Sequence, residues 1–162
     1  MSTKRMNVAR DAAFFVALLT TALALGGALA HALELPNKIG MSREAYFVVQ
    51  NIYRGWNRLG YLLAVQLVGM LAVAILYRRE RSVMRPALVA VGCLMTAQII
   101  FWTLTFPANT ATSNWTIAPT NWETLRQQWE YSHLAGAVLQ TLAMAALIVA
   151  VLARYRNGGS AG

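Results

Sequence analysis

The two histidines of the chain each lie three residues from a glutamate, at the edge of an apolar run. His31 and Glu34 belong to "HALE", whereas Glu130 and His133 belong to "EYSH", so the order is reversed. Residues three apart share one face of a helix, and Glu-x-x-His pairs on facing helices hold metal ions in helix bundles. If the two faces meet, two imidazoles and two carboxylates converge. Such a ligand set suits iron, manganese, copper or zinc.

A metal-free interpretation of these residues is also open. Each histidine can hydrogen-bond the glutamate of its own helix, and nearby arginines can pair with the carboxylates. The sequence leaves the cofactor unknown. The candidate is a transition metal, either iron or copper. We predict a metal or acid–base site, or else a structural network with arginine partners at Arg54, Arg58 and Arg126.

The composition indicates a membrane protein. The chain is 57% hydrophobic and 12% charged, with a mean hydropathy of +0.45, which is too apolar for an ordinary soluble domain. Four apolar runs are each close to the ~20 residues that a helix needs to cross a bilayer. We expect an all-α integral membrane four-helix bundle forming a single domain over residues 1–162. Its spans are predicted at residues 11–33, 59–77, 86–106 and 132–153.

The basic residues predict how the bundle is oriented. Most of them fall in three clusters that share one side if the spans alternate, and basic loops face the cytoplasm. We therefore expect a multi-pass protein of a bacterial inner membrane with both termini cytoplasmic, in contact with the lipid bilayer. Because the charge is divided among short segments, a nucleic-acid partner is not indicated. The clusters are Lys4, Arg5 and Arg10, then Arg78, Arg79, Arg81 and Arg85, then Arg154 and Arg156.

The first run has two possible fates. A basic start followed by "ALAHA" resembles a cleavable signal peptide, but the apolar stretch is longer than usual for one. We therefore expect a retained first helix. The lone Cys93, in the middle of the third run, allows no intramolecular disulfide.

The outer segments, residues 34–58 and 107–131, are predicted to extend two of the helices beyond the membrane. Pro36 is expected to end the first helix just after Glu34. From Ser42 an amphipathic helix should run directly into the second span. After a loop that begins at Pro107, another helix should run from Thr120 unbroken into the fourth span.

Aromatic residues are concentrated on this outer side of the bundle. One interpretation is the aromatic belt that membrane proteins carry at the interface, and the other is an aromatic pocket that binds a cofactor or a flat apolar ligand. Asn109, in "PAN", could place its amide over such a pocket, although Asn is also common in turns. The pocket candidates are Tyr53, Trp56, Trp115, Trp122 and Trp129.

Four segments carry a resemblance to a known family: "HALELPNK", "NIYRGW", "PAN" and "NWETLRQQWEYSH". Together they resemble a bacterial branch of small four-span membrane proteins of unknown function, related to the anthrone oxygenase-like proteins. The likeness covers Leu25 to about Leu139. It implies a four-helix membrane protein and, for the fungal relatives, oxygenation of phenolic anthrones to quinones. Asn109, Trp129 and His133 match the most recognisable positions, with Trp115 and Trp122 next, whereas the segment from "HALELPNK" to "NIYRGW" departs from the fungal pattern.

Two functions remain open at this point. The first is an oxidoreductase or oxygenase-like enzyme that acts on an apolar aromatic substrate at the outer face, with His31, His133 and Asn109 as catalytic residues. The second is a non-catalytic membrane protein that binds a lipid, a small apolar ligand or a partner membrane protein. The sequence fixes neither the substrate nor the oligomeric state, so association of several copies stays open.

Overall fold

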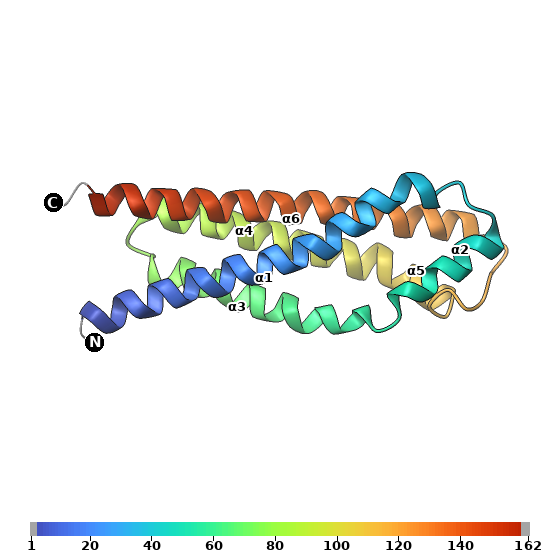
Figure 1. Ribbon diagram of the computed structural model, residues 1–162, viewed down its shortest axis with the longest axis horizontal. Coiled ribbons are helices and arrows are strands. Elements are labelled where there is room, and N and C mark those ends of the chain that lie inside the picture. The colour runs from blue at the N-terminus through green and yellow to red at the C-terminus, as the bar shows by residue number, and fades with distance from the viewer. Residues whose placement is uncertain (1–2, 160–162) are drawn as a thin grey trace.

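The computed structural model describes the backbone of residues 3–159 and the side chains of residues 5–157. Lys4, one of the basic residues named above, has its side chain outside this range. Four long helices lie side by side in an elongated bundle (Figure 1), and the described part of the chain contains no strand. They are α1 (Thr3–Lys38), α3 (Leu59–Leu76), α4 (Arg81–Ile100) and α6 (Trp122–Gly159).

All four helices are long and apolar enough to cross a membrane, so the predicted all-α bundle and its membrane class are confirmed. Both chain termini lie at one end of the bundle (Figure 1). We name this the terminal end, which contains Arg10, Tyr77, Glu80 and Arg154. The opposite end, where α2 and α5 lie, is here the aromatic end.

The interior of the bundle consists largely of small side chains. Because lipid tails are as apolar as leucine, helices in a membrane associate through close packing rather than through a hydrophobic driving force. Helices α1 and α3 approach closely at Gly69 of α3, since a Cβ atom there would lie 2.9 Å from the Ala17 backbone nitrogen. Large apolar side chains such as Phe15, Val68 and Ile99 point outward instead. The small core residues include Ala13, Ala17, Ala87, Ala90, Ala143 and Ala150.

One polar cluster crosses the middle of the bundle. The Gln66 side-chain amide donates to the Thr21 hydroxyl at 3.1 Å and to the side-chain oxygen Oε1 of Gln140 at 2.8 Å. These bonds join α3 to α1 and α6. All three side chains are buried. Since each finds a partner, the cluster serves to hold the helices together.

The end of α1 differs from the prediction. Pro36 lies inside the helix, which continues to Lys38, whereas the sequence led us to expect its end just after Glu34. A proline removes one backbone hydrogen bond, and the helix resumes the pattern at once, because Ile39 N–H donates to the Leu35 carbonyl at 3.0 Å. As a result Lys38 shares a helix face with Glu34, four residues earlier.

The predicted continuous helix from Ser42 into the second span is also wrong. Ser42 caps a separate helix, α2 (Arg43–Gln50), by accepting a hydrogen bond from Ala45 N–H. Two short 3-10 turns follow before α3 begins (Asn51–Tyr53 and Trp56–Arg58). Between them Gly55 has a φ of 89°, a conformation that glycine adopts without steric penalty. The glycine therefore breaks the helix and turns the chain toward the membrane.

The third span ends later than predicted. A π-helical turn, labelled η3 (Phe101–Thr105), leads into α5 (Phe106–Ala111), so the loop begins after Ala111 and not at Pro107. Pro107 lies in the first turn of α5, directly after the π-helical turn, so the helical path continues through this proline. By contrast, the predicted unbroken extension of the fourth span is confirmed, since α6 runs from Trp122 through the whole bundle.

Candidate functional site

The aromatic end contains a second core, separate from the core of the membrane spans. It consists of Tyr46, Ala108, Trp115, Leu125 and Trp129. The sequence-predicted aromatic residues all contribute to it or border it. Trp115 lies with its ring centroid 6.0 Å from that of Trp129, and Tyr53 lies 5.4 Å from Trp129 and 5.1 Å from Trp56. Trp122 packs against this core from the start of α6.

A buried lysine lies at the centre of this end. The Lys38 ammonium is 3.0 Å from Glu130 Oε1 and 3.9 Å from Glu34 Oε2, and it donates to the Tyr53 hydroxyl at 2.9 Å. Only 2% of the Lys38 side chain and none of the Glu130 side chain is exposed. Moving an ion out of water into a protein interior costs on the order of several kcal/mol. A buried charge therefore needs partners such as these.

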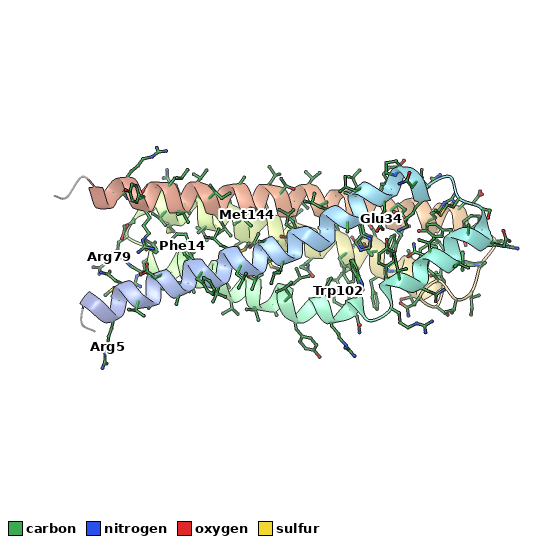
Figure 2. The ribbon with its side chains drawn as sticks, in the orientation of Figure 1. Arg5, Phe14, Glu34, Arg79, Trp102 and Met144 are labelled. Atoms are coloured by element: carbon green, nitrogen blue, oxygen red, sulfur yellow. The ribbon has the colours of Figure 1, made fainter. Side chains whose placement is uncertain are left out.

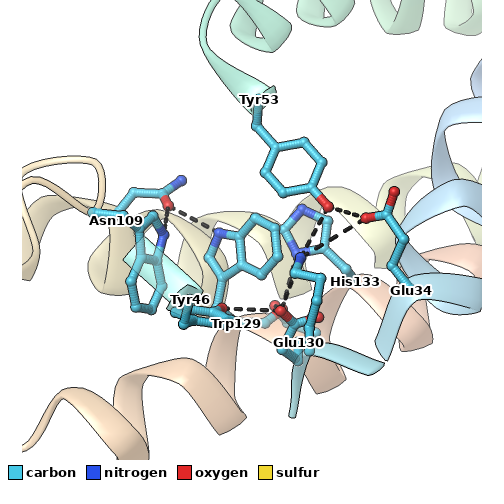
Figure 3. Close-up of polar contacts among 10 residues, drawn as sticks. Glu34, Tyr46, Tyr53, Asn109, Trp129, Glu130 and His133 are labelled. Carbon is cyan, nitrogen blue, oxygen red and sulfur yellow. Dashed lines mark hydrogen bonds and ion pairs between the residues drawn. The ribbon is translucent and has the colours of Figure 1, made fainter. Parts of the chain in front are cut away.

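Two tyrosines complete the arrangement. Tyr46 donates to Glu130 Oε1 at 2.9 Å, and Tyr53 donates to Glu34 Oε2 (Figure 3). Burial and the neighbouring carboxylates raise the pKa of both phenols above its usual value, so both stay protonated and act as donors. We call Lys38, Glu34, Glu130, Tyr46 and Tyr53 the Lys38 network.

Aromatic rings enclose the same ammonium. Lys38 Nζ lies 4.5 Å from the ring centroid of Tyr53, 4.6 Å from that of Trp129 and 5.8 Å from that of Tyr46. The negative faces of these rings stabilise a cation that has left water. The cation in this aromatic enclosure is thus the chain's own lysine.

The predicted four-ligand metal set does not form in this geometry. Glu34 and Glu130 turn toward Lys38 and the tyrosines instead of toward the histidines (Figure 3). Within the described residues, no group of three or more His, Cys, Asp or Glu side chains is placed to hold a metal ion. The physical reason is the extra turn of α1, because it brings a cation between the two carboxylates.

The two histidine rings lie in contact, so the two helix faces that carry them do meet. Their ring centroids are 4.2 Å apart, and the His133 ring lies 3.9 Å from that of Trp129. His133 Nδ1 is 2.9 Å from the Trp129 carbonyl oxygen. Since a carbonyl only accepts, Nδ1 carries the proton and Nε2 of the neutral ring is left with a free lone pair.

His31 occupies the more buried position of the two, with 7% of its surface exposed. Its ring is surrounded by aromatic neighbours, with the Tyr53 centroid at 4.4 Å and the Trp56 centroid at 5.1 Å. Its Nδ1 is buried and has no hydrogen-bond partner. A buried polar atom without a partner is rare in native proteins and marks a site that can accept a ligand atom or a proton.

Asn109 holds two tryptophans at once. Its Oδ1 accepts from Trp129 Nε1 at 2.9 Å and from Trp115 Nε1 at 3.1 Å (Figure 3). Trp115 reaches this position from a tight loop in which Ser113, Asn114 and Trp115 all have positive φ, an unfavourable conformation for residues with a side chain. Asn109 is therefore placed to position the indoles and does not itself reach the histidines through any of these bonds.

Two residues of the site, Lys38 and Tyr46, were not predicted from the sequence. Lys38 follows Glu34 by four residues, which is a recognisable ion-pair spacing on a helix, but Pro36 placed it in an expected turn. The arginine partners expected for the carboxylates are not used here. Arg126 instead donates to the Met41 carbonyl at 2.7 Å and lies over the Trp122 ring.

The site thus joins the end of α1, α2, α5 and the start of α6 around a histidine pair and the Lys38 network. Glu34 is its most exposed carboxylate, at 38%, and connects the network to the surface. The chain matches no protein-family model, no curated protein and no solved structure at a significant level.

Proposed function

We propose that the protein is an oxygenase-like oxidoreductase of a bacterial inner membrane, which acts on an apolar phenolic substrate at the aromatic end. The observation that carries this proposal is the histidine pair, in which His133 Nε2 has a free lone pair and His31 Nδ1 has no partner. Ionisable groups inside a membrane bundle are candidates for function by default. The resemblance to the anthrone oxygenase-like proteins supplies the reaction class.

The orientation forms part of the proposal. Arg10, Arg78, Arg79 and Arg154 lie at the terminal end, and Figure 2 shows Arg79 at that end and Glu34 at the other. Basic loops stay in the cytoplasm, so the termini are cytoplasmic and the histidine pair faces the opposite side. A substrate that partitions into the bilayer would reach this face from the membrane edge.

The chemistry needs a base and a route for the proton. His133 Nε2 removes a proton from an activated C–H or phenol of the substrate, which leaves an electron-rich anion that dioxygen oxidises. For an activated CH2 group the overall change is CH2 plus O2 to C=O plus H2O. Both hydrogens of the CH2 group end in the water product, so the proton taken up by His133 Nε2 is returned to oxygen. The His31 ring lies against His133 at this position.

None of these steps is carried out by a metal ion. The residues predicted as ligands do not fit one here, because Glu34 and Glu130 are ion-paired with Lys38. The histidine pair alone offers two nitrogen ligands, fewer than the three that open catalytic zinc sites use.

The test measures dioxygen uptake by the purified, full-length protein with anthrone as the probe substrate. We expect His133→Ala to lower the rate about a hundredfold or more, because general base catalysis contributes about 10²–10⁴-fold. His31→Ala should lower it as well. Tyr61→Phe is a matched control, since Tyr61 is 80% exposed and lies outside the site. Circular dichroism and gel filtration check that each variant is folded.

A second function is favoured by a separate observation. A groove of about 360 Å³ lies on the outside of the bundle between α4, η3 and α6, lined by Leu104, Tyr131, Ala135 and three glutamine or threonine side chains. It suits an apolar ligand with a polar end, as a non-catalytic lipid-binding or ligand-binding protein would offer. If anthrone causes no dioxygen uptake but binds with equal affinity to wild type and His133→Ala, this second function stands and the first falls.

A further inference from the structure

A pocket at the terminal end has side chains of both charges and is independent of the histidine site. Its volume is about 540 Å³, within the range of about 300–1,000 Å³ that is usual for small-molecule sites. It lies where the start of α1, the α3–α4 turn and the end of α6 meet. Two asparagines contribute to the lining, together with Arg10, Asp11, Tyr77, Glu80 and Arg154.

Two donors in this lining have no partner. Tyr77 is only 1% exposed, and neither its hydroxyl nor the buried Arg10 Nε forms a hydrogen bond. The other end of the Arg10 guanidinium is occupied by the Leu76 carbonyl at 3.3 Å and by Glu80 at 2.9 Å. Because buried donors in native proteins are almost always satisfied, the two free donors indicate a missing acceptor.

The positive groups favour a phosphate as that acceptor. The Arg10 guanidinium lies 4.4 Å from the centroid of the Tyr77 ring, and that of Arg154 lies 5.9 Å from it. Two arginines thus lie over the ring of the tyrosine whose hydroxyl has no partner. Guanidinium groups bind phosphate oxygens through paired hydrogen bonds.

The carboxylates point to a cationic group beside the phosphate. Asp11 pairs with Arg154, and Glu80 pairs with Arg10. The Asp11 side chain is 62% exposed and that of Glu80 is 31% exposed, so both can accept further hydrogen bonds. With two arginines against two acids, the lining has no net formal charge and matches a zwitterion better than an anion.

The depth of the pocket is that of lipid headgroups. Asp11 begins the first predicted span, Tyr77 ends the second, and Arg154 directly follows the fourth. We propose that this pocket binds the headgroup of an aminophospholipid. The phosphate accepts from Arg10 Nε, the Tyr77 hydroxyl and Arg154, and the primary ammonium donates to Asp11 and Glu80.

The test measures retention of three lipids by the full-length protein in detergent, using native mass spectrometry with phosphatidylethanolamine, phosphatidylcholine and phosphatidylglycerol as probes. We expect phosphatidylethanolamine to be retained best. The trimethylated choline has no N–H to donate, and the glycerol headgroup has no cation for the carboxylates. Tyr77→Phe should weaken retention about fivefold, as expected for one lost hydrogen bond. The ring that packs on Phe14 remains, so the variant folds.

Arg79→Gln is the matched control, because Arg79 is exposed on the same turn but lies outside the pocket lining. It should leave retention of phosphatidylethanolamine unchanged. Equal retention of all three lipids, or no effect of Tyr77→Phe, would overturn the proposal. If phosphatidylglycerol is retained best, and Tyr77→Phe and Arg79→Gln reduce lipid retention equally, the binding belongs to a diffuse basic surface and the proposal is wrong. Displacement of the lipid by inorganic phosphate at a similar concentration would assign the pocket to a soluble phosphate compound.

Discussion

The ion pairs at the two ends of the bundle differ in their exposure to water. At the aromatic end Lys38 and Glu130 are removed from water and depend on each other, on Tyr46 and Tyr53, and on the ring of Trp129. At the terminal end the pairs between Arg10 and Glu80 and between Arg154 and Asp11 remain partly exposed. Water can replace a lost partner at the second end but not at the first. The same type of contact therefore has very different consequences for stability.

The comparison also separates the kinds of function that each end supports. The aromatic end is filled by its own side chains, which hold two histidines in one fixed arrangement. The terminal end instead has an open pocket of about 540 Å³ lined by charged side chains. A rigid, preorganised site suits proton transfer, whereas an open polar pocket at the membrane surface suits a headgroup.

The largest expected effect is that of Glu130→Gln. It leaves Glu34, at 3.9 Å, as the only carboxylate beside the buried Lys38 charge, and removal of one partner from a buried pair costs about 3–5 kcal/mol. The free energy of unfolding in detergent, followed by circular dichroism, measures this loss. Glu44→Gln, a change at an exposed carboxylate paired with Arg43, should have no measurable effect.

A double variant sharpens this test. Lys38→Met combined with Glu130→Leu removes both charges, and we expect it to be more stable than Glu130→Gln alone, because paired removal is often neutral or stabilising. A double variant as unstable as the single one would contradict the assigned pairing.

The next largest effect is expected for Asn109→Leu. Trp115 and Trp129 both lose their acceptor, and each buried N–H left unpaired costs about 1–3 kcal/mol. We expect a loss of about 2–4 kcal/mol on that basis, with a changed near-ultraviolet circular dichroism spectrum. Asn57→Leu, at an exposed asparagine, is the control, and an unchanged Asn109→Leu spectrum would rule out the shared bond.

A pair of glycine variants tests the middle of the bundle, between the two ends. Gly69→Ala places a Cβ atom 2.9 Å from the Ala17 backbone, and overpacking of this kind costs about 1–3 kcal/mol. Gly92→Ala meets nothing within 4 Å and should change stability little. Thermal unfolding of the two proteins in the same detergent makes the comparison, and equal melting temperatures would disprove the close contact of α1 with α3.

The smallest effect is expected for Asp11→Asn at the terminal end. Its pair with Arg154 is largely exposed, so the free energy of unfolding should change by less than about 1 kcal/mol. The same variant should nevertheless lower retention of phosphatidylethanolamine, since Asp11 supplies an acceptor for the ammonium. A stability loss as large as that of Glu130→Gln would remove the contrast between the two ends.

The helices of the membrane were predictable from the sequence because their signal is local. An apolar run of about 20 residues has to form a helix in lipid, where backbone groups find no water, and this holds for all four spans. The shared end of the two His/Glu motifs followed from the same reasoning, whereas the contact between His31 and His133 was left as a condition. Element ends were less predictable, as Pro36 and Pro107 show, because neighbouring residues decided whether each proline stopped the helix or was accommodated within it.

The sequence by itself determined the membrane class, the bundle and the shared end of the paired motifs. Only the tertiary structure decided what those motifs do there. One more turn of α1 carries Lys38 between Glu34 and Glu130, which turns an expected ligand set into an ion-paired network. Three-residue spacing fixes which side chains share a helix face. It does not fix which partner they choose, because burial, charge and the reach of side chains from other helices set that choice.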